Sequence, residues 1–200
     1  MSPNPNQSII AQETSKSEGL NDLEHNLIRK KLSAGETQTL RPYENIDADV
    51  DYDEGVYQYL RGIIKAGNSF FSIVDSRVQN KFKQPDKPDS YITTFVTRYK
   101  PGEPAEIIGS VEDGKVLTIG RSAQRGALSD DPKISRNHFK ISVEDSADGS
   151  TIEVTDAGST NGTVVLTMSP DALQSGNVEP SFWTADPTHL QEALFGKQPS

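Results

Sequence analysis

The second half of the chain alternates apolar and polar residues with a period of two. The alternation begins at residues 91–99, returns in several short runs up to residue 155, and is interrupted by turn residues such as Pro101-Gly102. Because successive side chains of a strand point to opposite faces of a sheet, this period predicts short strands with one buried face. We therefore expect a mainly β fold: an antiparallel β-sandwich over residues 85–200, irregular after residue 166, with a short helix over residues 187–195.

Apolar residues before this region recur at helical spacing instead. Between residues 54 and 66 they fall every three or four positions, and residues 69–83 repeat the spacing. This pattern predicts two short helices joined at Ala66-Gly67-Asn68, which form a helical hairpin over residues 53–84 that packs on the sandwich.

The first 52 residues are predominantly polar. Residues 1–19 are rich in Ser, Asn, Gln, Glu and Pro, and residues 33–52 form a polar, acidic stretch. Such a composition buries too little apolar surface to offset the entropy of ordering, so we expect residues 1–52 to be disordered or a linker. A transient helix is expected at residues 20–32, where leucines and an isoleucine stand at helical spacing.

Composition and charge narrow the classes of function. The net charge of −9 lacks the basic footprint that a general nucleic-acid binder needs, so no direct nucleic-acid partner is expected. The chain has no cysteine and its three histidines are scattered, so we expect neither a metal site nor another cofactor. No signal peptide or apolar span is visible, which predicts a soluble intracellular protein of the cytoplasm or nucleus, without a membrane partner.

Three polar clusters stand where predicted strands meet loops. They are Gly120-Arg121, the segment from Ser135 to His138, and Ser159-Thr160-Asn161-Gly162. If the three loops meet at one end of the sandwich, they bring together a guanidinium, two hydroxyls and a carboxamide. That set of groups suits a tetrahedral oxyanion such as phosphate, because arginine forks onto the oxygens and hydroxyls donate short hydrogen bonds.

The same region contains residue types of a hydrolase. Ser135, His138 and Asp156 are a serine, a histidine and an acid, the three components of a nucleophilic triad. However, the chain has no Gly-x-Ser-x-Gly elbow and no glycine-rich loop ending in Gly-Lys-Ser/Thr. We therefore expect a protein that is not an enzyme and has no catalytic residues.

The order and spacing of the three clusters resemble those of a forkhead-associated (FHA) domain over residues 90–166. The resemblance implies a β-sandwich of the FHA/SMAD type that binds phosphothreonine peptides through loops at one end. It implies phosphopeptide contacts from five residues: Arg121, Ser135, Arg136, Thr160 and Asn161.

The resemblance also implies a role for each of these residues. Arg121 and Ser135 would contact the phosphate with help from Thr160, while Asn161 would hold the peptide backbone and Arg136 its flank. Three further residues would support the site from below: Gly120, His138 and Gly162.

The sequence departs from the family after Leu166. The second Asn-Gly and the later Gly-Asp that family members carry before their last strands are absent. Either residues 167–198 form a long insertion before missing strands, or the strands that close the sandwich are unusual.

The leading hypothesis is a phosphothreonine-peptide-binding adaptor in kinase-dependent signalling, whose partner is a phosphothreonine-containing protein. One alternative is the targeting end of a larger kinase or ligase. In a second, Thr37 or Thr39 of the linker is phosphorylated and occupies the site of its own chain or of a second copy. A third is a scaffold that binds its partner through the helical hairpin.

Overall fold

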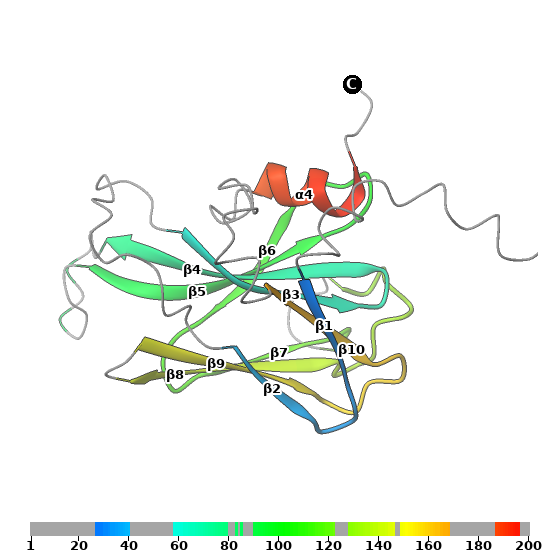
Figure 1. Cartoon of the computed structure of the whole chain (residues 1–200), viewed down its shortest axis with the longest axis horizontal. Helices are drawn as coiled ribbons and strands as arrows, with labels where there is room; N and C mark the ends of the chain where they lie inside the picture. Colours follow the sequence, from blue (N-terminus) through cyan, green and yellow to red (C-terminus); the bar gives the residue numbers. More distant parts are fainter. Residues whose placement is uncertain are drawn as a thin grey trace, which may run out of the picture.

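The fold is a sandwich of two antiparallel sheets (Figure 1). The computed structural model describes residues 27–40, 58–79, 83, 85, 90–122, 128–146, 149–168 and 187–196. The elements within these ranges are β1 (Leu27–Leu32), β2 (Thr37–Leu40), β3 (Gln58–Ala66), β4 (Ser69–Gln79), β5 (Ser90–Tyr99), β6 (Glu106–Val111), β7 (Val116–Ile119), β8 (Phe139–Ser146), β9 (Gly149–Asp156), β10 (Thr163–Met168) and the helix α4 (Pro187–Phe195). The prediction of a mainly β, antiparallel sandwich is confirmed.

The strand order places the last strand, β10, beside strands from the beginning of the chain. The six-stranded sheet has the order β1-β10-β3-β4-β5-β6, and the four-stranded sheet has the order β2-β9-β8-β7. Strand β10 therefore lies between β1 and β3, which both come from the first third of the chain. The neighbours of β10 in its sheet thus come from residues that precede the three polar clusters. Strands β1 to β4 complete both sheets.

Alternation along the strands builds the core between the sheets. Ile141 and Val143 of β8 lie opposite Val154 and Ile152 of β9, and all four side chains are buried. Across the sandwich, the rings of Phe71 and Phe139 meet edge to face with centroids 5.3 Å apart. Such pairing is the packing that aromatic rings favour.

A second apolar cluster covers the outer face of the six-stranded sheet. Figure 1 shows α4 lying along this face, and the helix was predicted over the same residues. The cluster consists of Leu60, Ile63, Phe70, Val74, Tyr99, Leu190 and Leu194. Strands β3 and β4 are consequently buried on both faces.

The predicted helical hairpin at residues 53–84 is wrong, because β3 and β4 form a β-hairpin. A strand buried on both faces carries apolar side chains at consecutive positions, so some of them also fall at helical spacing. Ile63 belongs to the outer cluster and Ile64 to the inner core. The two strands are joined by a turn at Gly67-Asn68, where Gly67 has a positive φ of 59°.

Two strands replace the helix and the linker expected near the N-terminus. Residues 27–32 of the expected helix at 20–32 form β1, and residues 37–40 of the expected linker form β2. Leu32 and Leu40 are both 2% exposed and anchor these strands in the core. The pairing partners of β1 and β2 lie far along the chain, so local spacing could not identify them. The disorder expected for residues 1–26 and 41–52 lies outside the described residues.

A buried ion pair ties the two sheets together away from the polar loops. Arg61 of β3 is 3% exposed and pairs with Asp75 of β4 at 2.6 Å. Its guanidinium also donates to Ser150 and to the carbonyl of Leu40, which both belong to the other sheet. A buried charge needs such partners, because an unpaired one is costly in the protein interior.

Candidate functional site

Gly120 lets two loop backbones meet directly after β7. A Cβ atom at this position would lie 2.1 Å from the carbonyl oxygen of Arg136, which no side chain tolerates. The neighbouring amides continue the contact: Arg121 N–H donates to the Ser135 carbonyl and Ser122 N–H to the Arg136 carbonyl, both at 3.0 Å. The close approach fixes the backbone of Arg121 beside Ser135, while the arginine side chain is exposed.

His138 connects the second and third clusters from inside the protein. Its ring is fully buried, and Nδ1 accepts a hydrogen bond from the backbone N–H of Ser135 at 2.9 Å. On the other side of the ring, Nε2 lies 3.0 Å from the carbonyl oxygen of Gly162. A neutral imidazole with its proton on Nε2 satisfies both contacts, because Nδ1 then accepts while Nε2 donates. The histidine therefore holds the two loops in a fixed relation.

Ser135 and Thr160 touch across these loops. The hydroxyl of Ser135 accepts a hydrogen bond from the backbone N–H of Thr160 at 2.9 Å, and the two side-chain oxygens are 3.4 Å apart. Thr160 is exposed and Ser135 is partly exposed. The serine hydroxyl donates in turn to Thr160 Oγ1 across the long distance of 3.4 Å, so its proton can turn from this weak contact towards a ligand.

Asn161 is oriented by the loop that carries Ser135. Its Nδ2 donates to the backbone carbonyl of Lys133 at 2.7 Å. The amide oxygen therefore points away from that contact, on an exposed side chain, and can accept a hydrogen bond. Gly162 follows with φ of 81°, a conformation that side chains other than glycine rarely adopt.

Asp156 organises the turn that presents Thr160 and Asn161. Its carboxylate accepts from the backbone amides of Gly158 and Ser159 and from the hydroxyls of Ser159 and Thr163, at 2.6–2.8 Å. Burial by itself would raise the pKa of Asp156, but these hydrogen bonds outweigh it and lower the pKa below its ordinary value.

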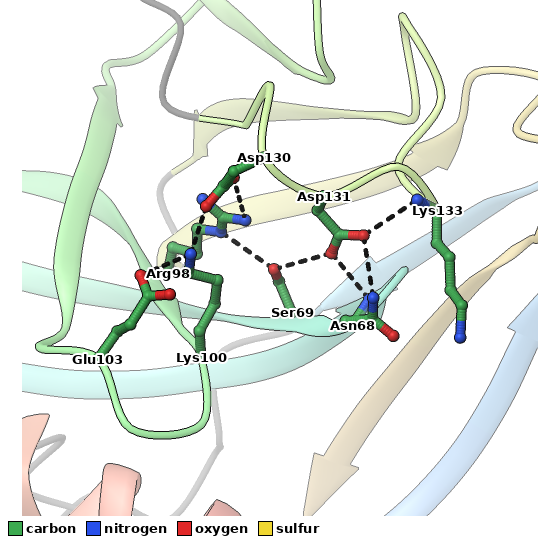
Figure 2. A network of polar contacts seen from close by, with 8 residues as sticks. All are labelled: Asn68, Ser69, Arg98, Lys100, Glu103, Asp130, Asp131 and Lys133. Carbon is green, nitrogen blue, oxygen red and sulfur yellow. Dashed lines mark hydrogen bonds and ion pairs between the residues drawn. The ribbon is translucent and has the colours of Figure 1, made fainter.

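Asp131 fastens the loop before Ser135 to the tip of the β3–β4 hairpin (Figure 2). The side chain is 2% exposed and accepts from the backbone amides of Asn68 and Lys133 and from the hydroxyl of Ser69. A Cβ at Gly67 would lie 2.9 Å from Asp131 Oδ2, so the hairpin tip packs directly against the loop. Residues from the first half of the chain thereby position a loop in the second half.

A second carboxylate fixes the same loop to β5, as Figure 2 also shows. Asp130 forms ion pairs with the buried Arg98, at 3.0 Å, and with Lys100. The hydrogen bond from Lys100 is the main reason that the pKa of Asp130 falls to about 2, with Arg98 contributing in the same direction. Lys100 also pairs with Glu103.

The three residue types of a hydrolase triad do not contact one another in the manner of a triad. His138 meets the backbone amide of Ser135 rather than its hydroxyl, and its other nitrogen faces Gly162. The carboxylate of Asp156 is engaged by Ser159, Thr163 and Gly158 instead of by the imidazole. These groups therefore hold loops in place.

The structure thus brings Arg121, Ser135, Thr160 and Asn161 together at one end of the sandwich, with Arg136 exposed beside them. Residues 117–178 match the family model of the FHA domain. The resemblance to FHA domains is confirmed. FHA domains bind phosphothreonine-containing proteins in signalling. The matched FHA segment contains β7 to β10 and all three clusters, but none of the strands β1 to β6. No curated protein and no solved structure matches the chain.

The candidate phosphosites Thr37 and Thr39 lie in β2 rather than in a flexible linker. Thr37 pairs with Thr155 of β9, and their side-chain hydroxyls are 2.7 Å apart. The flexible tether that motivated the switch hypothesis is therefore absent at these two residues.

Besides Gly120, His138 and Gly162, further residues hold the site in place, and sequence reasoning missed their support. Asp156 carries a readable signal, because an aspartate followed by Gly158 and Ser159 is typical of a turn in which the side chain accepts from the backbone. The sequence contains no such signal for the contact between Asp131 and Asn68, because these residues are 63 positions apart and meet only in the folded chain.

Within the described ranges, no group of three His, Asp or Glu side chains could hold a metal ion. No helix in these ranges is long and apolar enough to cross a membrane.

Proposed function

We propose that this protein is an adaptor that binds phosphothreonine peptides through the loops around Arg121, Ser135, Thr160 and Asn161. The observation that carries the proposal is the double contact of His138, which holds the Ser135 loop against the Asn161-Gly162 turn. This support leaves exposed donor groups side by side at one end of the sandwich. Groups fixed in this way bind an anion without an ordering cost at the moment of binding.

Each side chain has a chemical role in this proposal. The guanidinium of Arg121 forks onto two phosphate oxygens, and the Ser135 hydroxyl donates to a third. Thr160 adds a second hydroxyl close to that serine. The oxygen of the Asn161 carboxamide accepts from a backbone amide of the peptide, since its nitrogen is held by Lys133. Arg136 is exposed on the same loop and contacts the peptide flank.

The test measures the affinity of phosphothreonine peptides for the full chain and for Arg121→Ala. Charge-assisted hydrogen bonds contribute about 1.5–3 kcal/mol each, so the variant should bind at least about tenfold more weakly. Lys115→Ala is the matched control, because this exposed lysine lies at the opposite end of β7. Equal affinity for threonine and phosphothreonine peptides, or equal affinity of wild type and Arg121→Ala, would refute the proposal.

A further inference from the structure

The exposed cations around the FHA site have no anionic partner among the residues that the structure describes. Four basic side chains belong to the site loops or touch them: Lys31, Arg121, Lys133 and Arg136. All four are exposed, and within the described ranges none of them forms an ion pair. In a chain of net charge −9, four cations at this end of the sandwich thus have no ion-pair partner among the described residues.

The carboxylates nearby are occupied by other groups. Asp131 and Asp156 accept hydrogen bonds from backbone amides and hydroxyls of their own loops and of the β3–β4 hairpin. Asp130 is paired with Arg98 and Lys100, and Glu36 is paired with Lys30. None of these acids needs the four free cations, so the cations are available to a ligand.

Lys31 has the most informative position among the four. It belongs to β1, outside the FHA segment, and pairs with Val164, two positions after Gly162. Its stem crosses the face of Gly162, since a Cβ added to that glycine would lie 2.6 Å from Lys31 Cε and 3.5 Å from Nζ. The ammonium group is therefore next to the turn that is proposed to hold the peptide backbone.

Lys30, the residue before Lys31, points away from the site turn. Successive side chains of a strand alternate, so Lys30 lies on the opposite face of β1, where it pairs with Glu36 at 2.9 Å. The same strand thus holds one lysine that is neutralised within the protein and one that is not. The charge of Lys31 is therefore available to an external partner.

We propose that Lys31 binds a carboxylate side chain of the peptide close to the phosphothreonine, so that the site prefers acidic phosphopeptides. The inference rests on the proposed function, because it assumes that a phosphopeptide lies over Asn161 and Gly162. It adds a residue from β1 to the recognition surface. A ligand carboxylate at this point forms an ion pair that none of the described residues supplies.

The experiment uses the full chain and a series of phosphothreonine peptides with neutral flanks. One flanking position at a time carries Glu or its neutral isostere Gln, and affinity is measured at low salt. An exposed ion pair contributes up to about 1 kcal/mol, so Glu should bind about two- to fivefold more tightly than Gln at one or two positions. The preference should shrink as salt is added, because mobile ions screen exposed pairs.

Lys31→Gln should abolish the preference for Glu, so that each Glu peptide and its Gln partner bind this variant with equal affinity. Lys30→Gln is the matched control and should retain the preference; thermal melting of both variants verifies that they are folded. Phosphate-dependent binding without a preference for Glu, or a preference that survives Lys31→Gln, would overturn this inference alone. Binding that does not depend on phosphate would instead overturn the proposed function.

Discussion

Asp131, in the loop before Ser135, accepts a hydrogen bond at 2.8 Å from the backbone amide of Asn68 at the tip of the β3–β4 hairpin. The contact joins the N-terminal strands to the FHA segment. It makes the conformation of the loop that carries Ser135 depend on residues outside the stretch that matches the FHA family.

Replacing Asp131 should therefore affect stability and peptide binding together. Asp131→Ala leaves the amides of Asn68 and Lys133 and the hydroxyl of Ser69 without their acceptor. We expect the free energy of unfolding to fall by about 2–3 kcal/mol, measured by denaturant titration, and phosphopeptide affinity to fall as well. Glu144→Ala is the control: its side chain is exposed on β8, so the loss should be below about 0.5 kcal/mol. Equal stability losses in the two variants would contradict this role of Asp131.

Gly120→Ala should abolish peptide binding in a protein that still folds. The added methyl group would overlap the carbonyl of Arg136, so the loop must move away from Arg121. Such overpacking costs about 1–3 kcal/mol of stability. Gly102→Ala provides the comparison, because it has free space around it but a φ of 72° and so loses about 1 kcal/mol through strain alone. If Gly120→Ala binds phosphopeptide as tightly as Gly102→Ala, the close approach does not shape the site.

Acid should weaken the turn that Asp156 organises. The pKa of Asp156 is lower in the folded protein than its ordinary value, so the carboxylate contributes stability that is fully present above about pH 4. That contribution is lost as the pH falls from about 4 through the lower folded-state pKa. Asp156→Asn should therefore be less stable than wild type at pH 7, and the gap should narrow towards pH 3, measured by denaturant titration at each pH. A gap that is independent of pH would show that the charge of Asp156 is unimportant.

Residues 85–200 alone should fail to fold. This piece contains the FHA segment but lacks β1, β3 and β4 of the six-stranded sheet and β2 of the other sheet. It also loses the hairpin tip that holds Asp131. Circular dichroism and amide NMR spectra should show an unfolded chain, whereas the full chain gives a dispersed spectrum. A dispersed spectrum and phosphopeptide binding from residues 85–200 would contradict the assignment of the closing strands to the N-terminal part.

Whether the sequence pattern identified a strand depended on how many faces of that strand are buried. Strands β8 and β9 bury one face, so alternation identified them. Strands β3 and β4 bury both faces, and their nearly continuous apolar residues were mistaken for helices. The Gly67-Asn68 turn was the local signal that could have corrected this interpretation.

The residues of the candidate site also differ in how far the sequence alone predicts them. Motifs within one loop, such as Ser135 to His138, could be read from the sequence because their spacing is local, although their roles as ligands stay predictions. The support from Asp131 and the approach of Lys31 to Gly162 depend on pairing across the whole sandwich. Sequence position contains no signal for such contacts.

The place of β10 between β1 and β3 also sets the order in which the protein can form. Synthesis proceeds from the N-terminus, so β1 and β3 leave the ribosome well before the strand that joins them. Until β10 is inserted, each presents an unpaired edge that can pair with another chain. The Asn161-Gly162 turn directly precedes β10, so insertion of this strand closes the sheet and completes the binding surface in one late step.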